Sequence, residues 1–297
     1  MNPSVGKAME FSIVIPTYDR HDQISACLDS LKELDYPGDR FEVIVVDDGS
    51  PQALPPYKGP LRVTLVRQEH AGPAAARNTG AAAARGQWLA FTDDDCRPAV
   101  DWLSRLYGRL AHVPGHMVGG LTLNALTENP YATASQLLVH YLYEYYNRDP
   151  EHARFFTSNN LAVPAELFRR IGGFDARLTR AAGEDRDLCE RWREQGYGLS
   201  YEPAAVVYHA HDLTLRKFWR QHFQYGQAAF YFHRQRARRV ELEPPAFYLR
   251  PLRYPFSHGP GTAALRLAML LGLSQAANAA GYYSKRIRLI PNQAWDS

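Results

Sequence analysis

The chain has 297 residues, of which 45% are hydrophobic and 22% are charged. This ordinary globular composition excludes a wholly disordered, collagen-like or disulfide-scaffold protein, and at about 150 residues per domain the length allows one large domain or two modest ones. The formal net charge of +3 hides an asymmetry, because residues 213–297 carry 13 Lys and Arg against 3 Asp and Glu, whereas the other residues carry 21 against 28. A basic C-terminal segment behind an acidic body indicates two separate tasks.

Strand and helix patterns alternate over the first hundred residues. Short apolar runs at 11–16 and 41–46 have the pattern of strands buried on both faces, and further strands are predicted at 61–67 and 88–92. Apolar residues at helical spacing in 21–34 and an alanine-rich stretch at 71–85 predict helices between them. Alternation at such short spacing predicts an α/β domain in which helices flank a mostly parallel central sheet.

The rest of the chain contains three helical patterns and one further strand. Residues 187–195 predict a helix and residues 199–208 a strand. Residues 214–239 form a long amphipathic pattern with aromatic side chains on one face and many Arg and Lys residues. Residues 262–281 are mostly apolar, but Arg266 lies within this stretch and polar residues dilute it, so we expect an interfacial or packed helix rather than a membrane span.

The basic residues of the C-terminal segment suit an anionic surface. Lys285, Arg286 and Arg288 directly follow the apolar stretch, as expected near anionic lipid head groups. By composition alone, the basic and aromatic 214–239 pattern fits a nucleic acid as well as a membrane surface, and a merely solvated basic surface is a third interpretation. We expect an anionic membrane surface as a partner, and no nucleic acid.

Polar residues stand where three of the predicted strands end: Pro16, Thr17 and Asp19 at the first, Asp47 and Asp48 at the second, and Asp93, Asp94 and Asp95 at the fourth. Ligands of open parallel sheets bind at the carboxyl ends of the strands, so these residues should converge on one crevice. Because several carboxylates in one crevice repel each other, we expect a divalent metal among them and a phosphate-bearing ligand that it bridges. A solvated acidic turn at 93–95 and a helix N-cap at 47–48 are the alternatives.

The alanine-rich helix opens at a glycine. Gly72 precedes it, and the free N–H groups and the dipole of a helix N-terminus favour phosphate. Arg77, near the start of the same helix, is predicted to reach the nucleobase or the diphosphate. The alternative is an Arg on the surface of the helix.

The cysteines and the first residues bear on the cellular compartment. Cys27, Cys96 and Cys189 are widely spaced, so they give neither a zinc-binding spacing nor a disulfide framework. The first eleven residues lack the apolar run of a secretory signal. We expect a cytoplasmic protein that associates peripherally with the cytoplasmic face of the membrane.

Six segments of the sequence resemble, in order and spacing, those of the family 2 glycosyltransferases: FSIVIPTYDR, VIVVDDGS, AARNTG, FTDDDC, NNLAVPAELFRRIGGFD and GEDRDLCERW. The resemblance covers roughly residues 10–225. It implies the A-type glycosyltransferase fold and an inverting, metal-dependent transfer from a nucleotide-diphosphate sugar. We therefore expect a catalytic domain over 1–212, with a nucleotide-binding half at about 10–100 and an acceptor half at about 101–212, and a helical extension over 213–297.

The resemblance also assigns the metal and nucleotide residues. Asp93 and Asp95 match the Asp-x-Asp element of the family, with Asp95 as the main metal ligand and Asp93 as a ribose or further metal ligand. Asp94 is grouped with the residues that bind the nucleotide, and Asp47 or Asp48 with the nucleobase or ribose. A histidine after the last strand completes the metal shell in several members, which points to His209, with His211 nearby. Mn²⁺ and Mg²⁺ suit such oxygen and imidazole ligands, although a structural role for the histidines is an equal alternative.

The same resemblance assigns the catalytic base. Gly183-Glu184-Asp185 matches the Glu-Asp element, so Asp185 is expected to deprotonate the acceptor hydroxyl, with Glu184 as the neighbour most easily confused with it. An N-cap role for Asp185 is the alternative. Asn160 is predicted to contact the donor sugar, and Trp192 the sugar or the acceptor. The segment around Trp192 departs from the Gln-x-x-Arg-Trp signature of processive members, which favours transfer of single sugars.

The sequence thus predicts a metal-dependent inverting glycosyltransferase that moves one sugar, from a UDP-sugar by default, to a hydroxyl of a lipid-linked or envelope glycan. One alternative is a nucleotidyltransferase, which would carry a glycine-rich basic loop where this chain has Pro16 to Asp19. The other is a nucleotide-sugar-binding protein without activity.

Overall fold

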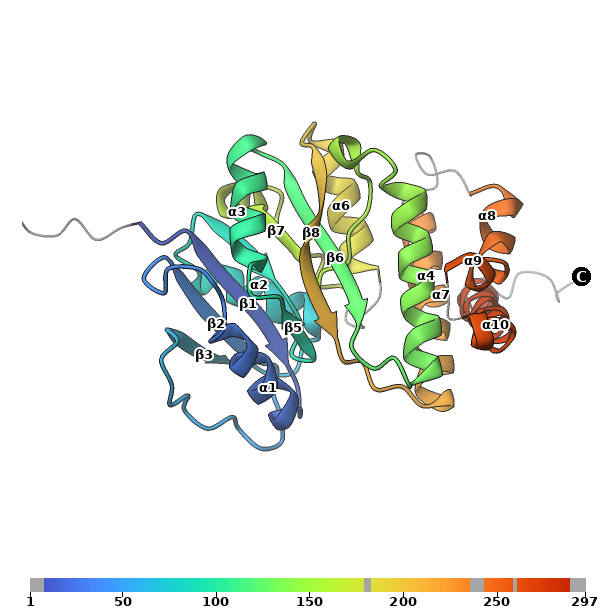
Figure 1. Ribbon diagram of the computed structural model, residues 1–297, viewed down its shortest axis with the longest axis horizontal. Coiled ribbons are helices and arrows are strands. Elements are labelled where there is room, and N and C mark those ends of the chain that lie inside the picture. Colours follow the sequence, from blue (N-terminus) through green and yellow to red (C-terminus); the bar gives the residue numbers. More distant parts are fainter. Residues whose placement is uncertain (1–7, 179–182, 236–242, 259–260, 289–297) are drawn as a thin grey trace, which may run out of the picture. The chain divides into compact units, whose positions relative to one another are not determined.

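The computed structural model describes residues 8–178, 183–235, 243–258 and 261–288. The chain divides into two compact units, one of residues 1–125 and 146–210 and the other of residues 126–145 and 211–297 (Figure 1). Residues 126–145 therefore group with the C-terminal helices, whereas the sequence places them in the acceptor half of a catalytic domain.

An eight-stranded sheet forms the centre of the first unit, in the order β3-β2-β1-β4-β7-β6-β8-β5. The strands are β1 (Phe11–Thr17), β2 (Phe41–Asp47), β3 (Val63–Arg67), β4 (Trp88–Phe91), β5 (Cys96–Pro98), β6 (Met117–Asn124), β7 (Leu161–Pro164) and β8 (Leu199–His209). Neighbours among β3, β2, β1 and β4 are parallel, as are β6 and β8, and the other neighbours are antiparallel. The α/β fold and the five predicted strands are confirmed, with small shifts at their ends.

Alternate residues of the central strands face opposite layers of helices. Phe11, Ile13 and Ile15 of β1 point into the core that α1 (His21–Leu31) and α3 (Trp102–His112) cover. Val14 points the other way, toward α2 (Pro73–Ala83), where a Cβ on Gly80 would lie only 2.4 Å from Val14 Cγ1. Burial on both faces is why these strands read as continuous apolar runs. The unit also contains α5 (Ala165–Arg170), α6 (Glu184–Glu194) and a short 3-10 helix (Pro150–His152).

The second unit is helical in its described part. Its helices are α4 (Pro130–Tyr146), α7 (Leu215–Gln235), α8 (Pro245–Leu249), α9 (Pro255–His258) and α10 (Ala264–Arg288), with 3-10 turns at Arg250–Leu252 and Gly261–Ala263. Leu137 and Tyr141 of α4, Phe218 of α7 and Leu267 of α10 share one apolar core. The helix predicted over 214–239 is confirmed as far as Gln235, and residues 236–239 lie outside the described residues.

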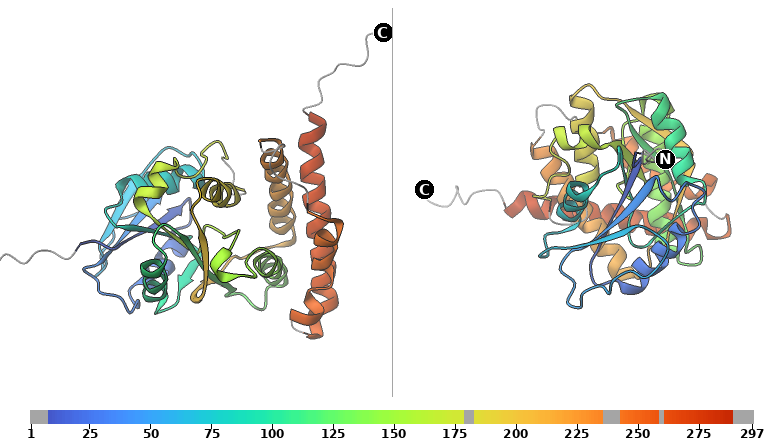
Figure 2. Two further views of the ribbon diagram at one scale, coloured as in Figure 1. Left: turned by 90° about the horizontal axis from the view of Figure 1, so that it is seen from above. Right: turned by 90° about the vertical axis from the view of Figure 1, so that its left-hand side faces the viewer.

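Helices α7 and α10 lie side by side (Figure 2). Their backbones approach closely at two glycines: a Cβ on Gly226 would lie 1.8 Å from the carbonyl oxygen of Asn278, and a Cβ on Gly281 would lie 2.0 Å from that of Phe223. The apolar stretch predicted at 262–281 is therefore a packed helix, and it continues to Arg288. Among the described helices, none combines the length and the apolar character needed to cross a membrane.

Candidate active site

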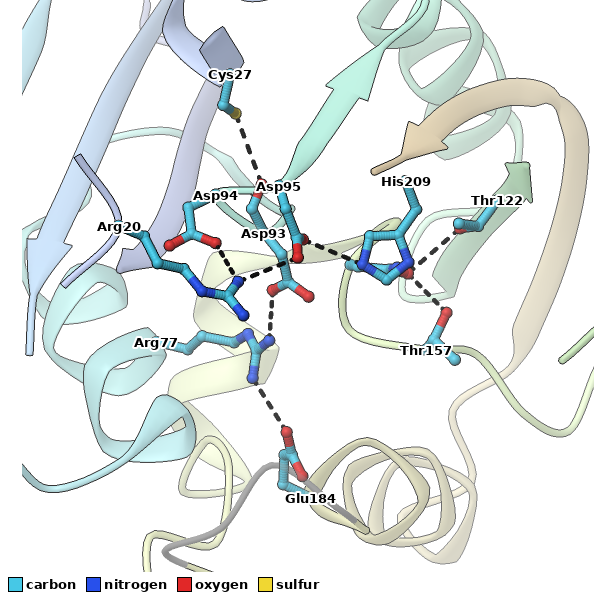
Figure 3. Close-up of polar contacts among 11 residues, drawn as sticks. Arg20, Cys27, Arg77, Asp93, Asp94, Asp95, Thr122, Thr157, Glu184 and His209 are labelled. Carbon is cyan, nitrogen blue, oxygen red and sulfur yellow. Dashed lines mark hydrogen bonds and ion pairs between the residues drawn. The ribbon is translucent and has the colours of Figure 1, made fainter. Parts of the chain in front are cut away.

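The acidic turn after β4 lies beside the end of β8. Strand β5 pairs with β8 in a register that sets Cys96 opposite His209. The backbone oxygen of the preceding residue, Asp95, accepts a hydrogen bond from the N–H of Ala210 (2.8 Å). One oxygen of the Asp95 carboxylate, Oδ1, then lies 3.1 Å from His209 Nε2 (Figure 3). Sheet register thus brings together two predicted site residues that are far apart in the sequence.

Arg20 bridges two carboxylates of this turn. Its Nη1 donates to Asp94 Oδ1 (2.8 Å) and to Asp95 Oδ2 (3.1 Å), and Thr17 Oγ1 donates to Asp94 Oδ2 (2.7 Å). Burial raises the pKa of Asp94 to about 6 against the opposing charge of Arg20. Both oxygens of Asp94 and the hydroxyl of Thr17 thus have partners within the protein, and their contact with a nucleotide stays a prediction. The sequence prediction missed Arg20, although it directly follows Asp19 in the loop after the first strand.

Arg77 connects the third aspartate to the start of α6. Its guanidinium donates to Asp93 Oδ1 (2.6 Å) and to Glu184 Oε1 (3.2 Å), and its side chain is only 4% exposed (Figure 3). This burial contradicts the alternative of a surface Arg. The two carboxylates also hold the guanidinium, and its contact with the nucleobase or the diphosphate stays a prediction. Arg77 joins the end of β4 to the helix that carries the candidate base.

Helix α6 begins with the two candidate bases. Its N-cap is Gly183, which has a φ of +88°, so the alternative of Asp185 as the N-cap is wrong. Glu184 is buried, and burial together with the charge of Asp185 raises its pKa to about 7 against the charge of Arg77. Asp185 is partly exposed, and its Oδ1 accepts a hydrogen bond from the Arg186 N–H (2.7 Å). Burial also raises the pKa of Asp185. Of the two carboxylates, Asp185 is the one that solvent reaches.

Asp48 fixes the loop that leads into α2. Its carboxylate accepts hydrogen bonds from Gln68 Nε2 (2.7 Å) and from the backbone N–H groups of Ala71 and Gly72 (2.9 Å each). Asp48 is thus not the N-cap of α2, which is Gly72, and the contact of Asp48 with the nucleobase or ribose stays a prediction. The same carboxylate accepts the Gly72 N–H, and phosphate binding at this helix N-terminus also stays a prediction.

Asp47 has one buried carboxylate oxygen that accepts no hydrogen bond from the described residues. Its Oδ1 accepts a hydrogen bond from the Ser50 N–H (2.9 Å). Its Oδ2 is buried and accepts no hydrogen bond from the described part of the chain, and Arg67 Nη1 lies 3.6 Å away. Of the two acids predicted at the nucleobase or ribose, Asp47 is therefore the one with a free oxygen.

The first loop is shorter than predicted. Pro16 is buried inside β1, opposite Val46, rather than in the loop after it. Asp19 has a φ of +53°, is exposed, and donates its N–H to Ser50 Oγ (2.8 Å). Tyr18 between them is 43% exposed, with its ring centroid 4.4 Å from that of His70. This exposed aromatic pair stands near the two aspartates at the end of β2, and the sequence prediction did not single it out.

The residues around His209 fit a hard divalent cation. A carboxylate oxygen of Asp95, a ring nitrogen of His209 and the sulfur of Cys96 all lie within 4.8 Å of one another. Oxygen and imidazole ligands suit Mn²⁺ and Mg²⁺, whereas a cysteine sulfur suits softer metals, and burial raises the pKa of the Cys96 thiol. Burial opposes protonation of His209, but the bond to Asp95 raises its pKa overall. Asp93 lies outside this described group, and His211 belongs to the second unit and stays a prediction.

Two residues predicted to contact the sugar or the acceptor are fully buried. Asn160 is fully buried, accepts a hydrogen bond from Trp102 Nε1 and donates to the carbonyl oxygens of Leu121 and Ala205 (2.9 Å each). Trp192 is also fully buried in the first unit. Neither side chain reaches solvent in this structure, and the contacts of both with a sugar or an acceptor stay predictions.

Comparison with known proteins adds a family. A model described as Glycosyl transferase family 2 matches residues 12–172. The pre-mycofactocin glycosyltransferase of Mycobacterium tuberculosis strain H37Rv is 32% identical over 237 residues, which cover 76% of this chain and 48% of that protein. Glycosyltransferase AglE of Haloferax volcanii is 27% identical over 204 residues, which cover 67% of this chain and 66% of that protein. The chain thus spans about half the length of the first of these relatives.

Solved structures match the fold over nearly the whole chain. The mannosyltransferase PcManGT of Pyrobaculum calidifontis, in complex with GDP-Man and Mn²⁺, is 23% identical with a TM-score of 0.63, and the match covers 94% of this chain and 88% of that one. Residues 1–349 of TarS from S. aureus are 18% identical with a TM-score of 0.51, covering 94% and 92%. Both likenesses support the predicted A-type glycosyltransferase fold.

Proposed function

The chain belongs to glycosyl transferase family 2 and is a glycosyltransferase, and from this premise we propose that it transfers one sugar from a nucleotide-diphosphate sugar to an acceptor hydroxyl with inversion. We propose further that the transfer depends on Mn²⁺ or Mg²⁺. The observation that carries this proposal is the Arg77 guanidinium, which ties Asp93 at the end of β4 to Glu184 beside the candidate base. Arg77 therefore connects the proposed donor-binding edge of the sheet to the helix that carries the proposed proton acceptor.

Side chains at the ends of the strands support the proposed binding of the nucleotide-sugar donor. Asp47 Oδ2 would accept a hydrogen bond from the nucleobase or ribose, since a carboxylate suits both N–H and O–H donors. Tyr18 offers an exposed aromatic face to the base. Asp95 and His209 would hold the metal, and a divalent cation supplies charge stabilisation to the leaving diphosphate. The Arg20 side chain, which is 43% exposed and pairs with Asp94 and Asp95, adds a positive charge at the same edge of the sheet.

The base is Asp185 in this proposal. Inverting transfer needs one carboxylate that takes the proton of the acceptor hydroxyl while its oxygen attacks the anomeric carbon. The bond between that carbon and the diphosphate oxygen breaks in the same step, and the diphosphate leaves with the electron pair. Glu184 is buried and held by Arg77, whereas Asp185 is partly exposed.

The substrates are proposed from the family and its relatives. A UDP-sugar is the default donor for the family, and GDP-mannose is the second candidate because PcManGT was solved with it. TarS is named as a poly(ribitol-phosphate) beta-N-acetylglucosaminyltransferase, and it is 36% identical to this chain over 93 residues. A polymer of this kind supports an envelope glycan as the acceptor, and a lipid-linked glycan is its membrane-bound counterpart.

The first test is calorimetric binding of UDP, GDP, dTDP and CDP, each with and without MnCl₂. We expect one nucleotide to bind, with an affinity that rises when Mn²⁺ is present. A folded protein that binds none of the four, with or without the metal, would contradict the proposed donor site.

The second test addresses the base. We expect Asp185→Asn to abolish release of nucleoside diphosphate from the donor, with water or a panel of glycan acceptors, and to retain binding of the nucleotide. Glu190→Gln is the matched control, because Glu190 lies on the same helix and pairs with Arg193 at the surface. Turnover by the Asp185 variant at the rate of the control would refute the assignment.

A further inference from the structure

Six exposed apolar residues share one face of α10, and we call them the α10 stripe: Leu265, Met269, Ala276, Ala280, Tyr283 and Ile287. The four large side chains among them are 53% to 68% exposed. At about 100° per residue, all six lie within about 60° of the helix circumference. An apolar stripe that runs along the full length of a helix and faces solvent is a feature of interaction sites.

The opposite face of α10 is already occupied. Leu267, Leu271 and Ala277 are buried there, and Gly281 lies against the backbone of α7. A side chain at Gly226 or Gly281 would collide with the facing helix, so the two helices are locked in one rotational setting. The stripe therefore faces away from α7, and rotating it inward would break this close packing.

The charged residues of the sequence segment that contains the stripe are all of one sign. Residues 244–288 contain no Asp or Glu, and they contain six Lys and Arg residues: Arg250, Arg253, Arg266, Lys285, Arg286 and Arg288. Arg266 and Arg286 are exposed, and the helical spacing puts them on opposite sides of the stripe, near its two ends. An apolar strip edged by arginines matches a surface with an apolar interior and an anionic rim.

We propose that the α10 stripe docks on an anionic lipid bilayer, with α10 lying in the plane of the membrane. The stripe would enter the boundary between head groups and acyl chains, and Arg266 and Arg286 would contact lipid phosphates. A second copy of the chain fits less well, because two stripes packed face to face would bring their basic flanks together. The proposal rests on the second unit alone and not on the proposed catalytic residues.

Flotation of the full chain with vesicles tests the proposal. We expect binding to vesicles of phosphatidylcholine with phosphatidylglycerol at low salt, weaker binding at high salt, and little binding to phosphatidylcholine alone. Met269→Glu with Ile287→Glu should abolish binding. Arg266→Gln with Arg286→Gln should weaken it about thirtyfold, at about 1 kcal/mol for each basic residue near the surface.

Matched controls separate this test from folding and from catalysis. Val100→Glu changes an apolar residue of the first unit that is 56% exposed, and it should leave vesicle binding unchanged. The substituted side chains are exposed, so thermal melting and calorimetric nucleotide binding should match those of the parent. Loss of vesicle binding with intact nucleotide binding thus separates the two proposals.

A fluorescent label shows which residues enter the lipid. The three native cysteines are buried, so a thiol-reactive NBD reagent should label the Met269→Cys variant at position 269 alone. We expect its emission to shift to the blue with anionic vesicles, whereas a label on Val100→Cys should not respond. The proposal is overturned if the Glu variants still bind vesicles or if the parent does not bind them at low salt. It is also overturned if the NBD emission shifts to the blue without vesicles as the protein concentration rises and light scattering shows a dimer.

Discussion

His222 of α7 provides a quantitative test of the core of the second unit. Its side chain is 1% exposed, and neither ring nitrogen has a hydrogen-bond partner in the described part of the chain. The ring packs edge-on against Phe218, with centroids 4.4 Å apart, and against Tyr225 at 5.5 Å. Burial, with a smaller contribution from the charge of His211, lowers the pKa of His222 to about 4.

The sign of the pH effect follows from this lowered pKa. The unfolded chain, with an ordinary histidine pKa of about 6.5, binds the proton more readily than the folded chain does. The free energy of unfolding should therefore decrease as the pH falls from about 6.5 to about 4. At about 1.4 kcal/mol per pH unit, the full loss caused by His222 is about 3 kcal/mol, and about 2 kcal/mol of it is present at pH 5.

The perturbation is His222→Leu, which keeps a similar volume and removes the titration. We expect urea unfolding, followed by circular dichroism, to show that the parent loses about 2 kcal/mol more than the variant between pH 8 and pH 5. Hydrogen exchange of α7 and α10 peptides locates the loss in the second unit. His112→Leu, at an exposed site on α3, controls for the removal of any one histidine. Parallel pH profiles of the parent and His222→Leu would refute the reasoning.

Three further substitutions test the site. Arg77→Met leaves Glu184 buried without its cation, so we expect a loss of about 3–5 kcal/mol in urea unfolding at pH 8, partly restored by adding Glu184→Gln; a stability equal to the parent's would contradict the bridge. Asn160→Leu leaves the Trp102 indole N–H unpaired, so we expect the free energy of unfolding to fall by about 1–3 kcal/mol with an unchanged nucleotide Kd in calorimetry. A weakened Kd would instead support the predicted contact of Asn160 with the donor. Asp95→Asn should weaken Mn²⁺-dependent nucleotide binding about tenfold or more without lowering the melting temperature, and an unchanged metal dependence would remove Asp95 from the metal site.

Three strands of the parallel half, β1, β2 and β4, could be predicted because they are buried on both faces. Runs such as FSIVIP and FEVIVV differ from helical patterns in length and in β-branched residues. Strands β5, β6 and β7 gave no such signal. β5 and β7 have only three and four residues, and β6 carries two glycines, so their partners in the sheet rather than their own pattern determine them.

The site could be predicted as a location but not residue by residue. The acids at the strand ends do gather at one edge, because parallel strands end on the same side. The role of each acid depends on contacts with distant segments. Asp48 accepts hydrogen bonds from the loop before α2, whereas Asp47 keeps one oxygen without a hydrogen bond from the described residues. Asn160 lies in a segment that resembles the family motif, yet its amide is used entirely within the core.

The position of β5 at the edge of the sheet affects the apparent affinity of ligands that bind beside it. A three-residue edge strand has few backbone hydrogen bonds to lose, so it opens more readily than the central strands. Asp95 and His209 face each other only while β5 is paired with β8. A ligand that binds between Asp95 and His209 therefore also stabilises the pairing of β5 with β8. The apparent affinity of this ligand equals its intrinsic affinity multiplied by the fraction of molecules in which β5 is paired. Substitutions that merely stiffen this edge would tighten binding without touching a ligand.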